Sequence, residues 1–263
     1  MIEKMNDYGN DLGLYREEYE QDSCGVGFIS DIKGRKSHQT VSDALTILEN
    51  MEHRGACGCD PDSGDGAGIL MEIPHDFLAE EVAKDGITLP EPGQYALGLF
   101  FLPKRPTVKE TCKKIIEEAC GIQGMEVLGF RKVPVDITGI GETALSVEPD
   151  MEQLFLKRPD ALTDDDEFER KLFVLKARIT KMVLDRETDT KKFYVATLSA
   201  RKTVYKGQLR SIQVRNYFPD LGDKRLTSAY GMVHSRFSTN TSPSWKLAQP
   251  FRFMSHNGEI NTI

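Results

Sequence analysis

The chain is 263 residues long and carries 34 lysine and arginine residues against 41 aspartate and glutamate residues, a formal net charge of −7 at pH 7. This acidic balance provides no basic face for nucleic acid or an anionic membrane, so neither is expected as a partner. Hydrophobic residues make up 39% of the chain, as in ordinary globular proteins, and no apolar run approaches the roughly 20 residues of a membrane span.

The first 23 residues are rich in Glu, Asp, Tyr and Asn and have no periodic apolar face. Cys24 follows, and residues 25–29 after it form an apolar run typical of a buried strand. If the leader is removed, Cys24 carries both a thiol and a free α-amino group, whose usual pKa of about 8 lets it act as a base near neutral pH. Cys24 then supplies a nucleophile together with its activating base. From these residues alone, the other interpretation is a small buried cysteine on a strand.

Apolar periodicity predicts alternating strands and helices in the first half of the chain. Residues 41–52 place apolar side chains on one helical face. Residues 53–68 then interrupt this pattern with five glycines, and residues 68–73 predict a strand. A β-α-β stretch is predicted from a strand over residues 94–102, a helix over residues 107–119 and a strand over residues 125–135.

The clearest helix pattern in the chain begins at Thr163, which forms a predicted capping box with Asp166. Apolar residues then recur at spacings of three and four as far as Met182. Further strands are predicted over residues 193–199, 203–205 and 230–237. The sequence ends at residue 263, just after a Gly-Glu step typical of a turn into a helix, so we expect the domain to continue beyond this chain.

Polar residues concentrate at the ends of three predicted strands. The first site is Cys24 itself, and the second is the glycine-rich segment EHRGACGCDPDSGDGAG at residues 52–68. The third comprises the segments HSRFSTNT at residues 234–241 and HNGE at residues 256–259. These segments are the candidate functional regions, because polar groups at strand ends frequently line binding sites.

Four motifs in this order, CGVGFI, HRGACGCDPDSGDGAG, HSRFSTNTSPSW and HNGEINT, closely resemble the N-terminal glutaminase domain of the glutamate synthase large subunit. This domain is a class II, or N-terminal-nucleophile, glutamine amidotransferase. The resemblance implies a propeptide over residues 1–23 and a partial amidotransferase domain over residues 24–263. It also implies an α+β fold, the four-layer α/β/β/α sandwich of N-terminal-nucleophile hydrolases, here incomplete at its C-terminus.

The resemblance implies a role for each matching residue. Cys24 is the nucleophile that attacks the side-chain amide of glutamine, releasing ammonia and then glutamate. The Asn257 side chain and the Gly258 N–H form the oxyanion hole. Arg236 binds the substrate α-carboxylate, and the Thr239 hydroxyl assists it. The family residue that binds the substrate α-amino group is expected after residue 263.

The implied partners are glutamine, downstream synthase domains of the same polypeptide, and a small reductase subunit or ferredoxin. FMN and an iron–sulphur cluster are expected in those downstream domains, and no cofactor is expected in this chain. The sequence leaves open whether NADPH, NADH or ferredoxin supplies electrons. Another class II amidotransferase and an inactive glutamine-sensing fragment are the alternatives, and the retained Cys24, Arg236 and Asn257 argue against the second.

The glycine-rich segment has other interpretations, which fail on spacing. A calcium-binding EF-hand loop is excluded by the residue types at Gly64, Asp65 and Met71. Cys57 and Cys59 form a single Cys-x-Cys pair without a second ligand pair, a weak zinc signal, so no metal is predicted. We interpret the segment as a wall of the substrate pocket built from backbone.

The remaining cysteines and histidines are given structural roles. Cys112 and Cys120 lie at helical spacing and are expected in the core. His234 and His256 are interpreted as structural, because a nucleophile with its own amine needs no separate base. Five cysteines, an odd number in a chain with no export-signal pattern, indicate reduced thiols and a cytoplasmic location.

Overall fold

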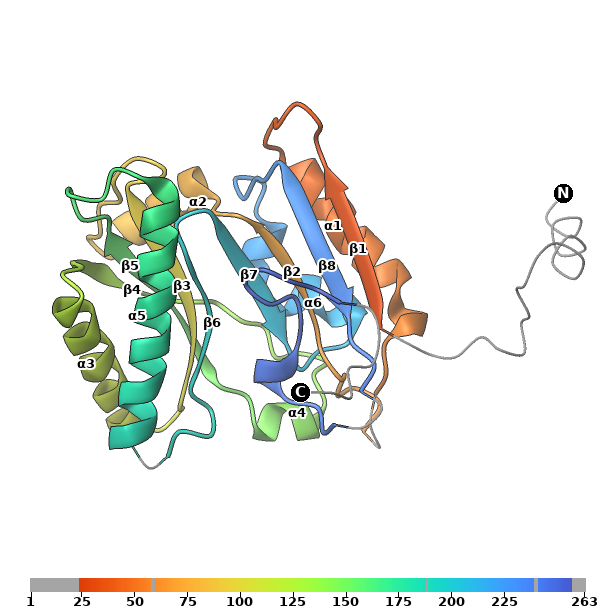
Figure 1. Ribbon diagram of the computed structural model, residues 1–263. Helices are drawn as coiled ribbons and strands as arrows, with labels where there is room; N and C mark the ends of the chain where they lie inside the picture. Colours follow the sequence, from red (N-terminus) through yellow and green to blue (C-terminus); the bar gives the residue numbers. More distant parts are fainter. Residues whose placement is uncertain (1–23, 58–59, 188, 239–240, 257–263) are drawn as a thin grey trace, which may run out of the picture.

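In the part of the chain that the structure describes, two four-stranded sheets form the centre (Figure 1). The computed structural model describes residues 24–57, 60–187, 189–238 and 241–256. The first sheet has the order β1 (Gly25–Ser30), β8 (Tyr230–Ser235), β2 (Ala67–Glu72) and β7 (Lys202–Gly207). The second has the order β4 (Val127–Lys132), β5 (Asp150–Lys157), β3 (Tyr95–Leu102) and β6 (Tyr194–Ser199). All neighbouring strands are antiparallel, and together with the helices they confirm the α+β class.

Helix α1 (His38–Asn50) packs directly on the first sheet because glycines let it approach closely. A Cβ added at Gly27 would lie 2.4 Å from Cγ2 of Ile47, and one added at Gly231 would lie 2.6 Å from Cβ of Ala44. The helix begins earlier than the predicted residue 41, since the Ser37 hydroxyl caps it by accepting the Thr40 N–H.

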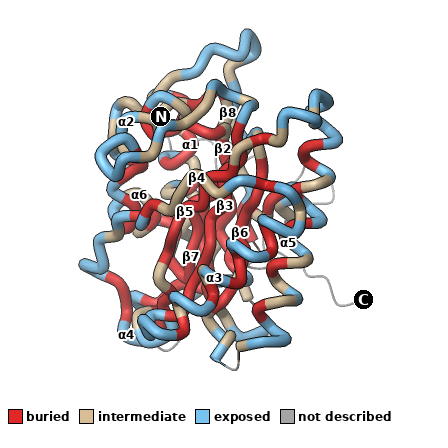
Figure 2. Tube along the Cα trace, turned by 90° about the vertical axis from the view of Figure 1, so that its left-hand side faces the viewer, coloured by how far each residue is buried: buried red, intermediate tan, exposed pale blue. Residues whose placement is uncertain are grey.

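Helices α3 (Pro106–Ile122) and α5 (Asp165–Arg186) cover one face of the second sheet (Figures 1 and 2). Alternate residues of β3 point to opposite faces, as in any strand. Ala96, Phe100 and Leu102 pack with α3 and α5. Leu97, Leu99 and Phe101 instead belong to a core cluster that includes residues of the first sheet. The two sheets therefore share a buried core.

Several shorter elements connect these parts. The short helices are α2 (His75–Ala83), α4 (Glu142–Ser146) and α6 (Val214–Tyr217). The 3₁₀ turns are η3 (Glu52–Arg54), η4 (Ser211–Gln213), η5 (Pro219–Gly222) and η6 (Trp245–Leu247). Strands β6 and β7 follow one another in the chain but belong to different sheets. In the described part of the chain, each helix is too short or too polar to cross a lipid bilayer.

Strand β5 is missing from the sequence prediction, and it lies between the two strands of the predicted β-α-β stretch. Strands β3 and β4 are thus parallel but not neighbours, with α3 connecting them. The apolar pattern does not reveal β5, because this strand carries a buried glutamate, Glu152. Glu152 pairs with Lys109 and Lys113 of α3. The cap of α5 also differs from prediction, since Asp164 rather than Thr163 accepts the Glu167 N–H at 2.6 Å.

Candidate active site

Cys24 lies immediately before β1, beside the residues that follow β8. The register pairs Gly25 with Ser235, so these two segments leave the first sheet at the same end. The Cys24 side chain is only 6% exposed. Its Sγ accepts the Phe237 N–H at 3.3 Å and lies 3.5 Å from the Phe237 carbonyl oxygen, to which the thiol donates. Main-chain groups thus fix the thiol at one end of the sheet.

Arg236 lies one residue before Phe237 and is buried. Its guanidinium donates from Nη1 to the Asp65 carbonyl at 3.3 Å and from Nη2 to Oγ1 of Thr241 at 2.7 Å. Burial lowers the pKa of Arg236, while the charges of Asp65 and Cys24 oppose this shift. A guanidinium has five N–H donors, and the structure describes partners for two of them. Its planar fork suits a carboxylate ligand.

The glycine-rich segment holds Arg236 through its main chain. The Arg236 N–H donates to the Gly66 carbonyl at 2.8 Å, and the Ala56 N–H donates to the Arg236 carbonyl at 3.3 Å. Gly66 has a φ of +142°, and a Cβ there would lie 2.9 Å from Cβ of Ala248. Only glycine fits this close approach without strain.

Asp65 is a site residue that the sequence analysis missed. It is 4% exposed, and its carboxylate accepts the Ser238 N–H at 2.6 Å. Burial raises the pKa of the Asp65 carboxyl, whereas the Ser238 N–H and the Arg236 charge act in the opposite direction. Asp65 therefore holds both the side chain of Arg236 and the main chain two residues later. No periodic pattern marks it, because it sits between glycines.

The other aspartates of this segment make structural contacts. The Asp60 carboxylate accepts from Oγ of Ser63 at 2.8 Å and from the Thr143 N–H at 3.0 Å, and the latter bond is the main cause of the lowered pKa of Asp60. The Ser63 hydroxyl accepts the Ala144 N–H at 2.9 Å, so both residues satisfy the first turn of α4. Within the described residues, His, Cys, Asp and Glu side chains form no group of three suited to a metal ion.

A cavity of about 390 Å³ lies beside Arg236. Backbone and small side chains of the glycine-rich segment form part of its wall, at Gly55, Ala56 and Gly66. Ser235 contributes to the lining, and its hydroxyl is hydrogen-bonded to that of Ser211 at 2.7 Å. Cys24 is not among the residues that line the cavity.

Comparison with known proteins gives the family. A family model described as glutamine amidotransferases class-II matches residues 24–263, beginning at Cys24. The chain belongs to the class II glutamine amidotransferases. Glutamate synthase (NADH) of Schizosaccharomyces pombe is 44% identical over 256 residues, covering 95% of this chain and 12% of that protein.

Two further relatives of this amidotransferase chain come from bacteria. The glutamate synthase (NADPH) large chain of Bacillus subtilis is 41% identical over 251 residues, covering 95% of this chain and 16% of the relative. Ferredoxin-dependent glutamate synthase 2 of Synechocystis is 40% identical over 244 residues, covering 93% of this chain and 15% of the relative. The chain thus spans less than a fifth of the length of these relatives.

Of the predicted site residues of this class II amidotransferase, the structure brings Cys24 and Arg236 to one end of the first sheet. Thr239, Asn257 and Gly258 lie outside the described residues, as do residues 1–23. Thr241 is a further site residue, since its hydroxyl accepts from Arg236. The sequence motif contains it, but nothing in the motif distinguishes its hydroxyl from that of Thr239.

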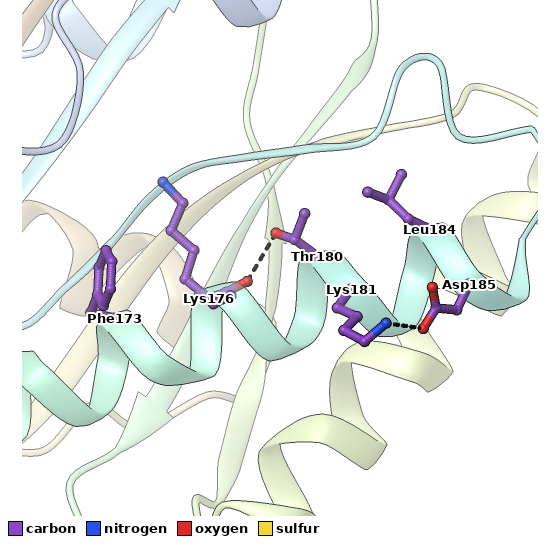
Figure 3. Close-up of a pocket in the computed structure, with 7 residues that line it drawn as sticks. Phe173, Lys176, Thr180, Lys181, Leu184 and Asp185 are labelled. Carbon is purple, nitrogen blue, oxygen red and sulfur yellow. Dashed lines mark hydrogen bonds and ion pairs between the residues drawn. The ribbon is translucent and has the colours of Figure 1, made fainter. Parts of the chain in front are cut away.

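A separate hollow of about 520 Å³ lies along α5 (Figure 3). Two pairs of its lining residues interact within the helix: Lys181 pairs with Asp185 at 2.8 Å, and the Thr180 hydroxyl donates to the Lys176 carbonyl at 2.9 Å. Exposed apolar side chains, including Phe173 and Leu184, form the rest of the lining. Neither Cys24 nor Arg236 lines this hollow.

Proposed function

We propose that this chain hydrolyses the side-chain amide of glutamine to glutamate and ammonia, and that the ammonia is used in glutamate synthesis. One observation carries the proposal: the Cys24 thiol is held by Phe237, directly next to the buried Arg236. A nucleophile and a carboxylate-binding group then lie at the same end of a sheet. The family match that begins at Cys24 and the names of the relatives support the same activity.

The chemistry requires removal of residues 1–23, which makes the Cys24 amine free. This amine takes the proton of the thiol, and Sγ attacks the carbonyl carbon of the substrate amide. The Asn257 side chain and the Gly258 N–H stabilise the oxyanion that forms. The carbon–nitrogen bond then breaks, the leaving group takes the proton from the amine, and ammonia departs. Water attacks the remaining thioester, which frees glutamate and restores the thiol.

Arg236 binds the α-carboxylate of glutamine in this scheme, with help from the Thr239 hydroxyl. The contacts to the Asp65 carbonyl and the Thr241 hydroxyl support this role, because they orient the guanidinium before substrate arrives. Pre-orientation lowers the entropic cost of binding. The substrate then presents its amide to Cys24.

The finer fold that we propose is the four-layer sandwich of N-terminal-nucleophile hydrolases, continuing beyond residue 263. The layers would be α1, the first sheet, the second sheet, and α3 with α5. The close packing of α1 on β1 and β8, and the shared core of the two sheets, support this order. Within it, residues 24–263 belong to one amidotransferase domain.

The whole protein is proposed to act as a glutamate synthase. Downstream domains outside this chain would hold FMN and an iron–sulphur cluster, and a reductase subunit or ferredoxin would supply electrons. The names of the relatives support this, since they include NADH, NADPH and ferredoxin-dependent enzymes. We place the protein in the cytoplasm, because the four described cysteines are unpaired thiols. Another class II amidotransferase is disfavoured by the relatives, which share the glutamate synthase name.

The test is Cys24→Ala in the full-length protein, assayed for glutamate synthesis from glutamine and, separately, from added ammonia. We expect glutamine-dependent synthesis to disappear while ammonia-dependent synthesis persists, because the nucleophile acts only on glutamine. Unchanged glutamine-dependent synthesis would refute the proposal. A glutamine-sensing protein would instead bind glutamine and release no ammonia even with Cys24 intact.

A further inference from the structure

Three neighbouring strands present Lys206, Gly68 and His234 in one row on the first sheet. The register pairs Gly68 of β2 with Lys206 of β7 on one side and with His234 of β8 on the other. Lys206 and His234 are both fully buried. The segment after η6, dark blue in Figure 1, lies against this row.

Each member of the row makes a different contact with that segment. Nζ of Lys206 donates to the Ala248 carbonyl at 2.6 Å. Gly68 leaves room for the Gln249 carbonyl, which would lie 2.9 Å from a Cβ at that position. Nε2 of His234 lies 2.7 Å from the His256 carbonyl oxygen. The segment is therefore fixed at its start and at its end.

Gln249 completes the attachment of His256. Its Oε1 accepts the His256 N–H at 3.1 Å, and its Nε2 donates to Nε2 of the His256 ring at 2.9 Å. One buried amide thus holds the main chain and the side chain of His256 at once. Together with His234, three hydrogen bonds fix the main-chain N–H, the carbonyl and the ring of this residue.

The protonation state of His234 suits this contact. A carbonyl oxygen only accepts, so Nε2 of His234 must carry the hydrogen. Burial lowers the pKa of His234 to about 4, and the hydrogen bond to His256 opposes this shift. The ring is therefore neutral at physiological pH and donates from Nε2, with no charge that needs a buried partner.

The His256 carbonyl belongs to the same planar peptide unit as the nitrogen and Cα of Asn257. A hydrogen bond to that carbonyl therefore restrains the peptide bond that leads into Asn257. We propose that His234 and Gln249 are positioning residues for the oxyanion hole, which act by orienting the His256–Asn257 peptide. This inference rests on the proposed function, in which Asn257 and Gly258 stabilise the oxyanion.

The experiment compares His234→Phe, His234→Gln and Gln249→Met in the full-length protein. His234→Phe keeps an aromatic ring but removes the Nε2 donor. In His234→Gln the side-chain amide can still donate to the His256 carbonyl. We expect kcat for glutamine to fall about tenfold to hundredfold in His234→Phe and Gln249→Met, with KM changed less than threefold, because losing an oxyanion donor outright costs about 10²–10³ in kcat. His234→Gln should recover most of the rate. Alkylation of Cys24 by a small electrophile should keep its wild-type rate.

The matched control is His38→Phe. Nδ1 of His38 makes the same kind of bond, to the Leu226 carbonyl at 3.0 Å, at the start of α1 and away from the site. This variant should keep the wild-type kcat. If His234→Phe fails to fold, as judged by a thermal melt, Gln249→Met and His234→Gln carry the test.

A double mutant separates the inference from the proposed function. In an Asn257→Ala background, adding Gln249→Met should lower kcat by less than about twofold, because the group that it positions is already absent. The inference would be overturned if Gln249→Met lowered kcat as much in the Asn257→Ala background as in the wild type. Wild-type kcat in both His234→Phe and Gln249→Met would also overturn it. Wild-type kcat in Asn257→Ala itself would instead overturn the proposed function.

Discussion

The carboxylate of Asp65 accepts the main-chain N–H of Ser238 at 2.6 Å, while the carbonyl of the same aspartate accepts from the guanidinium of Arg236. A single residue thus contacts the residues on either side of Phe237, the partner of the Cys24 thiol. The position of Asp65 therefore affects Cys24 and Arg236 together, the proposed nucleophile and the proposed carboxylate-binding residue.

Asp65→Ala should raise KM for glutamine by about tenfold or more. The Ser238 N–H loses its acceptor, and an unsatisfied buried donor costs about 1–3 kcal/mol. Asp65→Asn retains a side-chain oxygen that can accept this N–H, so it should show a smaller rise. Steady-state kinetics of both variants check the prediction, and equal KM values in Asp65→Ala and the wild type would contradict it.

Arg236→Lys keeps the positive charge but loses the planar fork, so it should not behave as a conservative change. We expect KM for glutamine to rise at least about tenfold, equivalent to about 1.4 kcal/mol of binding free energy. Alkylation of Cys24 by a small electrophile without an α-carboxylate should continue at a similar rate. An unchanged KM would require another residue to bind the carboxylate.

Processing is predicted to occur between Ser23 and Cys24. The intact mass and N-terminal sequence of the active protein should show a chain that begins at Cys24, because only then is its amine free to act as the base. The measurement is made on protein purified in its active form. Full activity from protein that retains residues 1–23 would exclude the free-amine mechanism.

The buried Lys206 should make stability depend on pH. Burial, together with the nearby charges of Lys176 and Arg236, lowers its pKa to about 7 in the folded protein. The unfolded chain, with the usual lysine pKa of about 10.4, then binds more protons between about pH 7 and 10. The free energy of unfolding should therefore rise with pH across this window.

Urea unfolding at pH 7 and pH 9.5 checks the contribution of Lys206. Lys206→Met should reduce the rise in stability between the two values. Lys181→Met, which removes an exposed lysine of α5, is the matched control and should leave the rise unchanged. An identical pH dependence in Lys206→Met and the wild type would show that Lys206 does not contribute.

Close packing of α1 predicts a contrast between two glycine substitutions. Gly231→Ala places a Cβ 2.6 Å from Cβ of Ala44 and should destabilise the protein by about 1–3 kcal/mol. Gly121→Ala lies within α3 with nothing within 4 Å of the new Cβ, and it should stabilise the protein by up to about 1 kcal/mol. Thermal unfolding of both variants should therefore show shifts of opposite sign.

The sequence predicted most of the elements whose periodicity is uninterrupted. Strand β3 and helix α5 follow their apolar patterns closely, and α3 extends the predicted helix by a few residues. Strand β5 was not predicted, because a charged residue in a strand normally faces solvent. Glu152 is instead buried and pairs with two lysines of α3. Pairing between elements that are distant in sequence is not visible in a local pattern.

In the candidate site too, residues marked by a local sequence motif were predicted, whereas residues that act through distant contacts were not. Cys24 and Arg236 were found from motifs that resemble a known family, and the structure places them together. Asp65 and Gln249 were not assigned roles, since their importance comes from contacts with residues far along the chain or across a turn. Asp65 lies 173 residues before the Ser238 that it contacts, a separation over which single-sequence reasoning has no signal.

The pairing of β1 with β8 also sets the order of events during synthesis. Cys24 contacts Phe237, 213 residues later in the chain, and the described neighbour of β1 in the sheet is β8. At translation rates of about 5–20 residues per second, the ribosome completes this partner on the order of tens of seconds after Cys24 is made. Cys24 therefore reaches these surroundings only after β8 and Phe237 have been made, and until then neither can cover its thiol.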